Sequence, residues 1–248
     1  GGAHRHAQTA PYIAVSPGTY QLPDGTWFEA GTVNTTSMQF DPECVHGPAA
    51  EWTEIKFKHL FDSAPAVVTQ LESMNSEVGK PPHTSSQPWF TVAQGGTSMT
   101  GVKVALERTH VPGPVHMMKP ETIAYFAIQN KKGEFDAAGG AKVLFEANAL
   151  SRVAPGWSHW PHPGSCGWFG FQHSYPRVPM VLAHVASRYD RHGGWLRQCA
   201  TPSGRGLHIV IDTDMLCTIN YHQRPHDKED VAYVAFSQPF GIELAPVS

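Results

Sequence analysis

The chain has 248 residues, which suits one large domain or two ordinary ones of about 100 to 150 residues. It is 41% hydrophobic and 16% charged, so it has enough apolar surface for a packed core and too little charge for a disordered chain. The formal net charge of -3 disfavours nucleic acids and anionic membranes as partners, and no apolar run predicts a membrane span. The 23 Gly and 21 Pro interrupt the chain too often for long helices, so the sequence predicts an all-β protein.

Taken in chain order, four segments of the first half recur in the second half. WFEAGTVN recurs as LFEANALS, FKHLFDSAPAVVTQ as FQHSYPRVPMVLAH, TGVKVALE as RGLHIVID, and TIAYFAIQ as VAYVAFSQ. A collinear series of this kind predicts two diverged copies of one module. The predicted parts are an N-terminal extension at 1–27, a first module at 28–130, a linker at 131–144, a second module at 145–240 and a C-terminal tail at 241–248.

Each recurring segment also has the pattern of a strand. Residues alternate between two faces at 57–61 and at 102–106, while AVVTQL and MVLAHV are apolar runs typical of strands buried between two sheets. Gly101 and Gly206 follow turn-like residues and are expected to begin strands. Five or six short strands in each copy predict two tandem antiparallel β-sandwich modules.

These segments resemble the H-type lectin family, in the strand FEAGTV, the pattern I-x-F followed by PAVV, the strand TG-V-K-V and the last strand IAYFAI. The resemblance implies six-stranded sandwiches, extracellular glycan binding and a homotrimer. It also implies a sugar site made by a His after the TG strand and an Arg on the strand before it. In the first copy His110 matches the His, but Trp89 stands near the Arg position. In the second copy Arg197 matches the Arg, and Thr213 or Asp214 replaces the His.

The two incomplete sets predict one composite glycan site where the modules meet. The loop GWSHWPHPGSCGWF has no counterpart in the first copy, and its aromatic rings and histidines are suited to stacking on sugars and binding hydroxyls. The alternative is a Trp-rich loop that covers a sheet edge. The expected ligand-binding residues are His110, Arg108, Trp89, Arg197, Asp214, Trp160 and His162.

Several of the 15 histidines recur between the copies. His59 and His173 lie in phase with apolar residues, so we expect them to be at least half-buried and hydrogen-bonded to backbone. His116 and His226 each precede an acidic residue, Glu121 or Asp230, and are expected either to brace a loop or to form half of a binding pocket.

Two pairs of histidines are spaced like metal ligands, namely His159 with His162 and His222 with His226. H-x-x-H spacing is a weak signal, so no cofactor is predicted and a His-bound divalent metal remains an open alternative. Zinc-hydrolase, serine-hydrolase and nucleotide motifs are missing from the sequence.

Two alternatives to a lectin remain open at this stage. A polysaccharide lyase or hydrolase needs only a His, a Tyr and an Arg in a groove, which Tyr221, His222, Arg224 and His226 would supply. A structural or adhesive extracellular protein needs no ligand site.

The four cysteines, Cys44, Cys166, Cys199 and Cys217, form no CxxC pair. Cys199 and Cys217 flank the SGRG turn and the strand after it, so we predict a disulfide between them. Cys44 and Cys166 precede equivalent strands, and their pairing stays open. The Asn34-Thr35-Thr36 sequon would accept a glycan in a secreted protein, which is the expected location.

Overall fold

The computed structural model describes residues 10–39, 51–76, 89–109, 119–156, 166–190, 193–213 and 227–247. Within these ranges the chain forms fifteen β-strands in four small sheets, which confirms the all-β prediction. No helix in this part of the chain is long and apolar enough to cross a membrane.

The first half forms two sheets, each named here after a central strand. The β2 sheet has the antiparallel order β1 (Gly18–Gln21), β2 (Trp27–Thr35), β8 (Glu121–Ile128) and β5 (Ala66–Leu71). In the β7 sheet, β7 (Gly101–Thr109) pairs antiparallel with β6 (Trp89–Ser98) and β4 (Thr53–Lys56), and parallel with the short β3 (Met38–Gln39). As predicted, Gly101 begins a strand, and Val102, Val104 and Leu106 point into the core.

The second half also forms two sheets. The β15 sheet has the order β12 (Met180–Val185), β15 (Glu229–Phe236), β10 (Lys142–Ala154) and β9 (Lys131–Asp136). The β14 sheet has the order β11 (Gly167–Gly170), β14 (Gly206–Thr213) and β13 (Gly194–Gln198). Segment 131–144, expected to be a linker, instead forms β9 and the start of β10, which pair as a hairpin.

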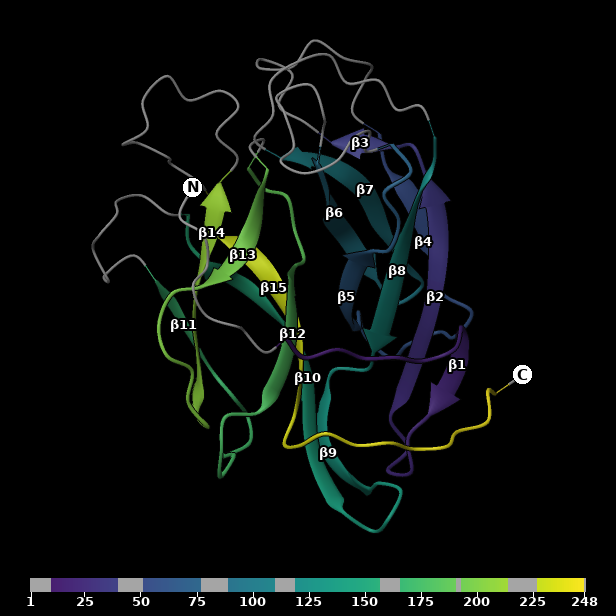
Figure 1. Cartoon of the computed structure of the whole chain (residues 1–248), viewed down its shortest axis with the longest axis vertical. Coiled ribbons are helices and arrows are strands. Elements are labelled where there is room, and N and C mark those ends of the chain that lie inside the picture. Colours follow the sequence, from purple (N-terminus) through teal and green to yellow (C-terminus); the bar gives the residue numbers. More distant parts are fainter. Residues whose placement is uncertain are drawn as a thin grey trace.

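Three apolar cores hold the four sheets together. One core lies between the β2 and β7 sheets, and another lies between the β15 and β14 sheets. The third joins the halves, because Phe28 and Phe126 of the β2 sheet share a cluster with Phe145 and Phe236 of the β15 sheet. The sheets are therefore arranged around the middle of the molecule like the blades of a small propeller (Figure 1), and they do not separate clearly into the two expected sandwiches.

A buried glutamate holds a turn in place in the first half. Glu29 of β2 is 1% exposed, and its Oε2 accepts hydrogen bonds from the backbone N–H groups of Lys58 and His59, at 2.7 and 3.0 Å. Its Oε1 accepts a third bond from the Tyr125 hydroxyl of β8, at 2.8 Å. These bonds help explain why residues 57–61, predicted to be a strand, form a bend: two of the backbone N–H groups bind a carboxylate instead of a neighbouring strand.

The second half repeats this arrangement. Glu146 of β10 is 0% exposed and accepts bonds from the backbone N–H groups of Gln172 and His173, at 3.0 and 2.7 Å. The Tyr233 hydroxyl of β15 donates to the same carboxylate at 2.6 Å. Corresponding residues of the sequence repeat thus make corresponding hydrogen bonds.

A second repeated carboxylate lies at the start of β8 and of β15. Glu121 accepts hydrogen bonds from the Ser73 hydroxyl and from the backbone N–H groups of Asn75 and Ser76, two and three residues after that serine. Glu229 accepts bonds from the Ser187 hydroxyl and from the backbone N–H groups two and three residues after that serine. The structural counterpart of Glu121 is therefore Glu229 and not Asp230, the acidic residue expected from the sequence.

Candidate functional site

The outer face of the β14 sheet gathers aromatic, basic and acidic side chains. Within β14 the buried residues Leu207, Ile209 and Ile211 alternate with His208, Val210 and Asp212, which project to the opposite side; of these three, Val210 is also buried, at 1% exposed. Residues that pair directly across an antiparallel sheet share a face. Trp168 pairs with His208, Trp195 with Asp212, and Arg197 with Val210 between them. We call Trp168, His208, Arg197, Trp195 and Asp212 the β14 face.

Contacts within the β14 face fix the orientation of its side chains. The Trp168 ring lies 4.7 Å from the His208 ring, centroid to centroid, and Trp168 is 48% exposed. The Arg197 guanidinium lies over the Trp195 ring at 5.4 Å from its centroid, and its Nε donates to Asp212 Oδ2 at 3.1 Å. An exposed indole, a ring nitrogen and an oriented guanidinium together can stack on a sugar ring and bind its hydroxyls.

A disulfide crosses this face. Cys166, immediately before β11, is bonded to Cys199, immediately after β13. The predicted bridge between Cys199 and Cys217 is therefore wrong. The cause is the sheet order: β11 and β13 flank β14, and Gly167 and Gln198 both pair with Ile209, which brings the two cysteines to the same level of the sheet. The bridge adds a weak indication of an oxidising compartment.

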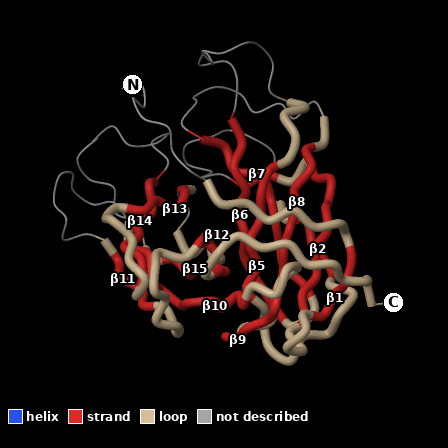
Figure 2. The backbone as a smooth tube through the Cα atoms, turned by 60° about the horizontal axis from the view of Figure 1, so that its bottom comes forward, coloured by secondary structure: helices blue, strands red, loops and turns tan. Residues whose placement is uncertain are grey.

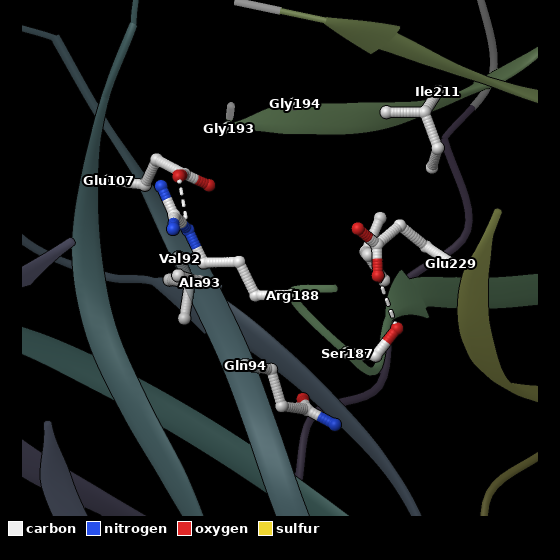
Figure 3. A pocket seen from close by; sticks show the side chains of 11 residues that line it. Val92, Ala93, Gln94, Glu107, Ser187, Arg188, Gly193, Gly194, Ile211 and Glu229 are labelled. Carbon is white, nitrogen blue, oxygen red and sulfur yellow. Dashed lines mark hydrogen bonds and ion pairs between the residues drawn. The ribbon is translucent and has the colours of Figure 1, made fainter. Parts of the chain in front are cut away.

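A nearly buried ion pair joins the two halves beside the β14 face (Figure 3). The Nε of Arg188, in the loop after β12, donates to Oε1 of Glu107 in β7 at 2.9 Å, and the two side chains are 12% and 7% exposed. Gly193 approaches the same carboxylate so closely that a Cβ there would lie 2.2 Å from Glu107 Oε1. The end of β7, next to Arg108, thus meets the start of β13, two residues before Trp195.

The contact of β6 and β7 with the loop after β12 and the start of β13, which we call the seam, borders a small cavity. Its volume is about 10 Å³, roughly the space of one water molecule. Its wall includes Gln94 of β6, which is 1% exposed and whose side-chain N and O find no hydrogen-bond partner in the described part of the chain. In Figure 3 the Gln94 side chain lies on the opposite side of Arg188 from Glu107. Leaving both polar atoms of a buried amide without partners is costly, so Gln94 destabilises this part of the seam.

A histidine also links the halves. His184 of β12 bonds through Nδ1 to the Val185 carbonyl at 2.7 Å and through Nε2 to the Thr69 hydroxyl of β5 at 3.2 Å. Because a carbonyl can only accept, Nδ1 carries the proton and Nε2 of the neutral ring accepts from Thr69. Burial lowers the pKa of His184 by disfavouring the charged ring, and the bond to Val185 opposes this only in part.

Of the expected ligand-binding residues, the structure describes one completely. Arg197 is exposed on the β14 face. The backbones of Trp89 and Arg108 lie in β6 and β7, where Phe90 pairs with Arg108, but their side chains lie outside the described part. Four other expected ligand-binding residues lie outside the described residues: His110, Asp214, Trp160 and His162. The same holds for the residues considered for a loop brace, metal binding or catalysis: His116, His159, Tyr221, His222, Arg224 and His226.

Two histidine predictions can be compared with the structure. His173 is half-buried, and its Nε2 bonds to the Phe145 carbonyl at 3.1 Å, as expected. His59 is half-buried too, but its ring stacks on Trp27 with centroids 4.3 Å apart. Both rings therefore support the packing around the buried glutamates.

Sequence reasoning missed Trp195, His208 and Asp212. A usable signal for two of them was the phase of RGLHIVID, in which His208 and Asp212 are four residues apart and so share the face opposite Leu207, Ile209 and Ile211, although the apolar Val210 lies on their face too. Trp195 carried no such signal, because its place on this face depends on how β13 pairs with β14.

Among the described residues, no group of three or more His, Cys, Asp or Glu side chains is arranged to hold a metal ion. No family model, no curated protein and no solved structure matches this chain. The arrangement of its own side chains is therefore what supports a function.

Proposed function

We propose that the chain is an extracellular carbohydrate-binding protein composed of two tandem, H-type-lectin-like β-sandwich modules. The observation that carries the proposal is the β14 face, on which an exposed tryptophan, a histidine and an Arg–Asp pair project from one rigid sheet. Sites on regular strands hold their side chains more precisely than sites on loops do. The resemblance of the repeated segments to H-type lectins supports the same function.

The chemistry of the face favours a neutral sugar with several hydroxyls. The Trp168 ring offers an apolar surface to the C–H face of a pyranose. Arg197 supplies donors, His208 supplies a donor or an acceptor, and the Asp212 carboxylate is an acceptor. Donors and acceptors that alternate around an aromatic platform match the alternating polarity of a sugar ring.

The disulfide and the seam would keep the face in one shape. Cys199 follows β13 and is tied across the sheet to Cys166, so β11 and β13 cannot separate. The Glu107–Arg188 pair holds the loop that leads to β13. A binding surface that is organised before the ligand arrives loses less entropy on binding.

The first test is a glycan array, followed by calorimetric titration of the best glycan against variants. Arg197→Ala and Trp168→Ala should each weaken binding by about 1 to 3 kcal/mol, because they leave sugar hydroxyls unpaired or remove the stacking surface. Arg177→Ala is the matched control, since Arg177 is exposed and lies outside the β14 face. Unchanged affinity in folded Arg197→Ala and Trp168→Ala proteins would rule out this face as the site.

Product analysis on neutral and acidic polysaccharides separates the other functions. A loss of substrate chain length would replace the lectin proposal with a polysaccharide-active enzyme. No binding and no cleavage would favour a structural or adhesive protein. The homotrimer is part of the proposal, and a solution mass of one chain by light scattering would remove it.

A further inference from the structure

A large apolar groove lies away from the β14 face, between the two terminal segments and the sheets. Its volume is about 1240 Å³, and we call it the terminal groove. Its walls are residues 10–16 and 239–244, the edge strand β12, and parts of the β2 and β14 sheets. Figures 1 and 2 show both terminal segments running across the sheets toward β1.

The groove is much larger than the voids that packing leaves in protein interiors. Interiors are packed as densely as organic crystals, and the few voids that remain are rarely larger than a water molecule. Pockets that hold small molecules are commonly about 300 to 1,000 Å³. The terminal groove, at about 1240 Å³, is therefore somewhat larger than a common ligand site and far larger than a packing defect.

The edge strand β12 shows that the groove leaves apolar side chains uncovered. All six residues of β12 are half-buried, although the strand reads MVLAHV. Its counterpart in the repeat is β5, which is more deeply buried. Ala66 is 1% exposed and packs in the core that the two halves share, and Val67 is 0% exposed and packs in the core of the first half. Tyr12, Val15 and Val178, at the rim of the groove, are among the large apolar residues that the protein exposes to solvent.

The lining also restricts the charge of an occupant. Glu243 is the only Asp, Glu, Lys, Arg or His among the described residues that line the groove. With no basic side chain among the described residues of the lining, a carboxylate or phosphate would lose its hydration there without gaining a partner, and Glu243 would repel it. Residues 1–9, GGAHRHAQT, contain no large apolar side chain, so the preceding segment of the chain does not match the lining.

We propose that the terminal groove binds an uncharged, elongated apolar molecule, of the class of long-chain alcohols and monoacylglycerols. The apolar chain would lie along the edge strand β12, in contact with side chains from both of its faces, Leu182 and Ala183 among them. The site is separate from the β14 face, so the proposal does not depend on glycan binding.

The experiment uses the whole chain and the neutral fluorescent probe N-phenyl-1-naphthylamine. Probe fluorescence should rise on binding, and 1-dodecanol should displace the probe at least tenfold better than dodecanoate, which has the same chain length but a charge. Ala183→Phe places a ring into the groove and should weaken probe binding at least tenfold. Ala141→Phe is the matched control, because Ala141 is exposed and does not line the groove; it should bind the probe like the parent.

A second blocking variant guards against misfolding of Ala183→Phe. Ala14 lines the groove from the N-terminal segment, outside every strand, so Ala14→Phe should also weaken probe binding and leave the fold intact. Equal probe binding by the parent, Ala183→Phe and Ala14→Phe would overturn the proposal, as would equal displacement by dodecanol and dodecanoate. If the parent is a dimer that binds no probe, a second copy covers the groove and the proposal also fails.

Discussion

The outer faces of the β7 and β14 sheets come from corresponding strands, yet they carry different side chains. In the sequence repeat Lys103 of β7 stands where His208 stands in β14, and Glu107 stands where Asp212 stands. Glu107 is used in the ion pair between the halves, whereas Asp212 orients Arg197 on the β14 face. One outward face therefore serves to hold the halves together, while the other offers groups to a ligand.

The buried positions differ far less between the halves. Glu29 and Glu146 accept the same set of backbone and tyrosine hydrogen bonds, from residues far apart in the chain. A buried carboxylate that organises a turn leaves few acceptable replacements, since losing it strands several donors. Outward positions have no such requirement. Function in this molecule is therefore to be sought where the halves differ.

The largest effect is expected from removing a buried glutamate. Glu146→Ala leaves the backbone N–H groups of Gln172 and His173 and the Tyr233 hydroxyl without their acceptor, so the free energy of unfolding should fall by about 5 kcal/mol, since each of the three donors costs about 1 to 3 kcal/mol. Urea titration measures it. Glu29→Ala should cost a similar amount, and a loss below about 1 kcal/mol for either one would contradict the shared role.

The control for both glutamates is Glu134→Ala. Glu134 is exposed and pairs with the exposed Lys142, so the change should stay within about 0.5 kcal/mol.

The next effect tests a bridge seen in the described part of the second half. Replacing Cys166 and Cys199 together by Ser opens a loop with a sequence separation of 33 residues. The chain-entropy relation gives a loss of about 3 to 4 kcal/mol for a loop of this size. Thermal unfolding of the double variant against the parent measures it, with dithiothreitol added to the parent as a control. A parent whose stability is unaffected by the reductant would show that the bridge contributes nothing.

A somewhat smaller loss is expected at the seam. Arg188→Ala leaves Glu107 nearly buried without its partner guanidinium, which should cost about 3 kcal/mol. Adding Glu107→Gln removes the stranded charge and should recover part of that loss. Lys142→Ala, at an exposed ion pair, is the control and should change little. If the double variant is no more stable than Arg188→Ala, the pair is not what holds the seam.

Much of the fold could be predicted from patterns that are local in the chain. Apolar runs and alternation located β5, β12, β7 and β14, and the four repeated segments showed that the halves correspond. The strand predicted at 57–61 does not form, because the N–H groups of Lys58 and His59 bind Glu29, a residue from a distant strand. The shared core of Phe28 and Phe145 was missed for the same reason: sequence periodicity shows that a face is buried but not what covers it.

The candidate site was less predictable. Arg197 was found through the resemblance, but Trp195 and His208 join it only because β11 and β13 both pair with β14. The disulfide prediction failed at the same step, since sequence proximity suggested Cys217 where the sheet order brings Cys166 to Cys199. Strand pairing is the information that a single sequence does not contain.

The smallest expected effect is on how far the first half's buried carboxylate, Glu121, makes the free energy of unfolding depend on pH. Burial raises the pKa of Glu121, but hydrogen bonds from Ser73, Asn75 and Ser76 outweigh it, so the folded-state pKa lies below its ordinary value of 4.5. The unfolded chain then takes up a proton first as the pH falls, so the contribution of Glu121 to stability is present above about pH 4.5 and is lost below it. Urea midpoints at pH 6, 5, 4 and 3 should show this decline. Glu121→Gln should make it shallower, whereas Glu72→Gln, at an exposed position, should keep the slope of the parent. Parallel declines in the parent and Glu121→Gln would show that this carboxylate is not bound more tightly than in the unfolded chain.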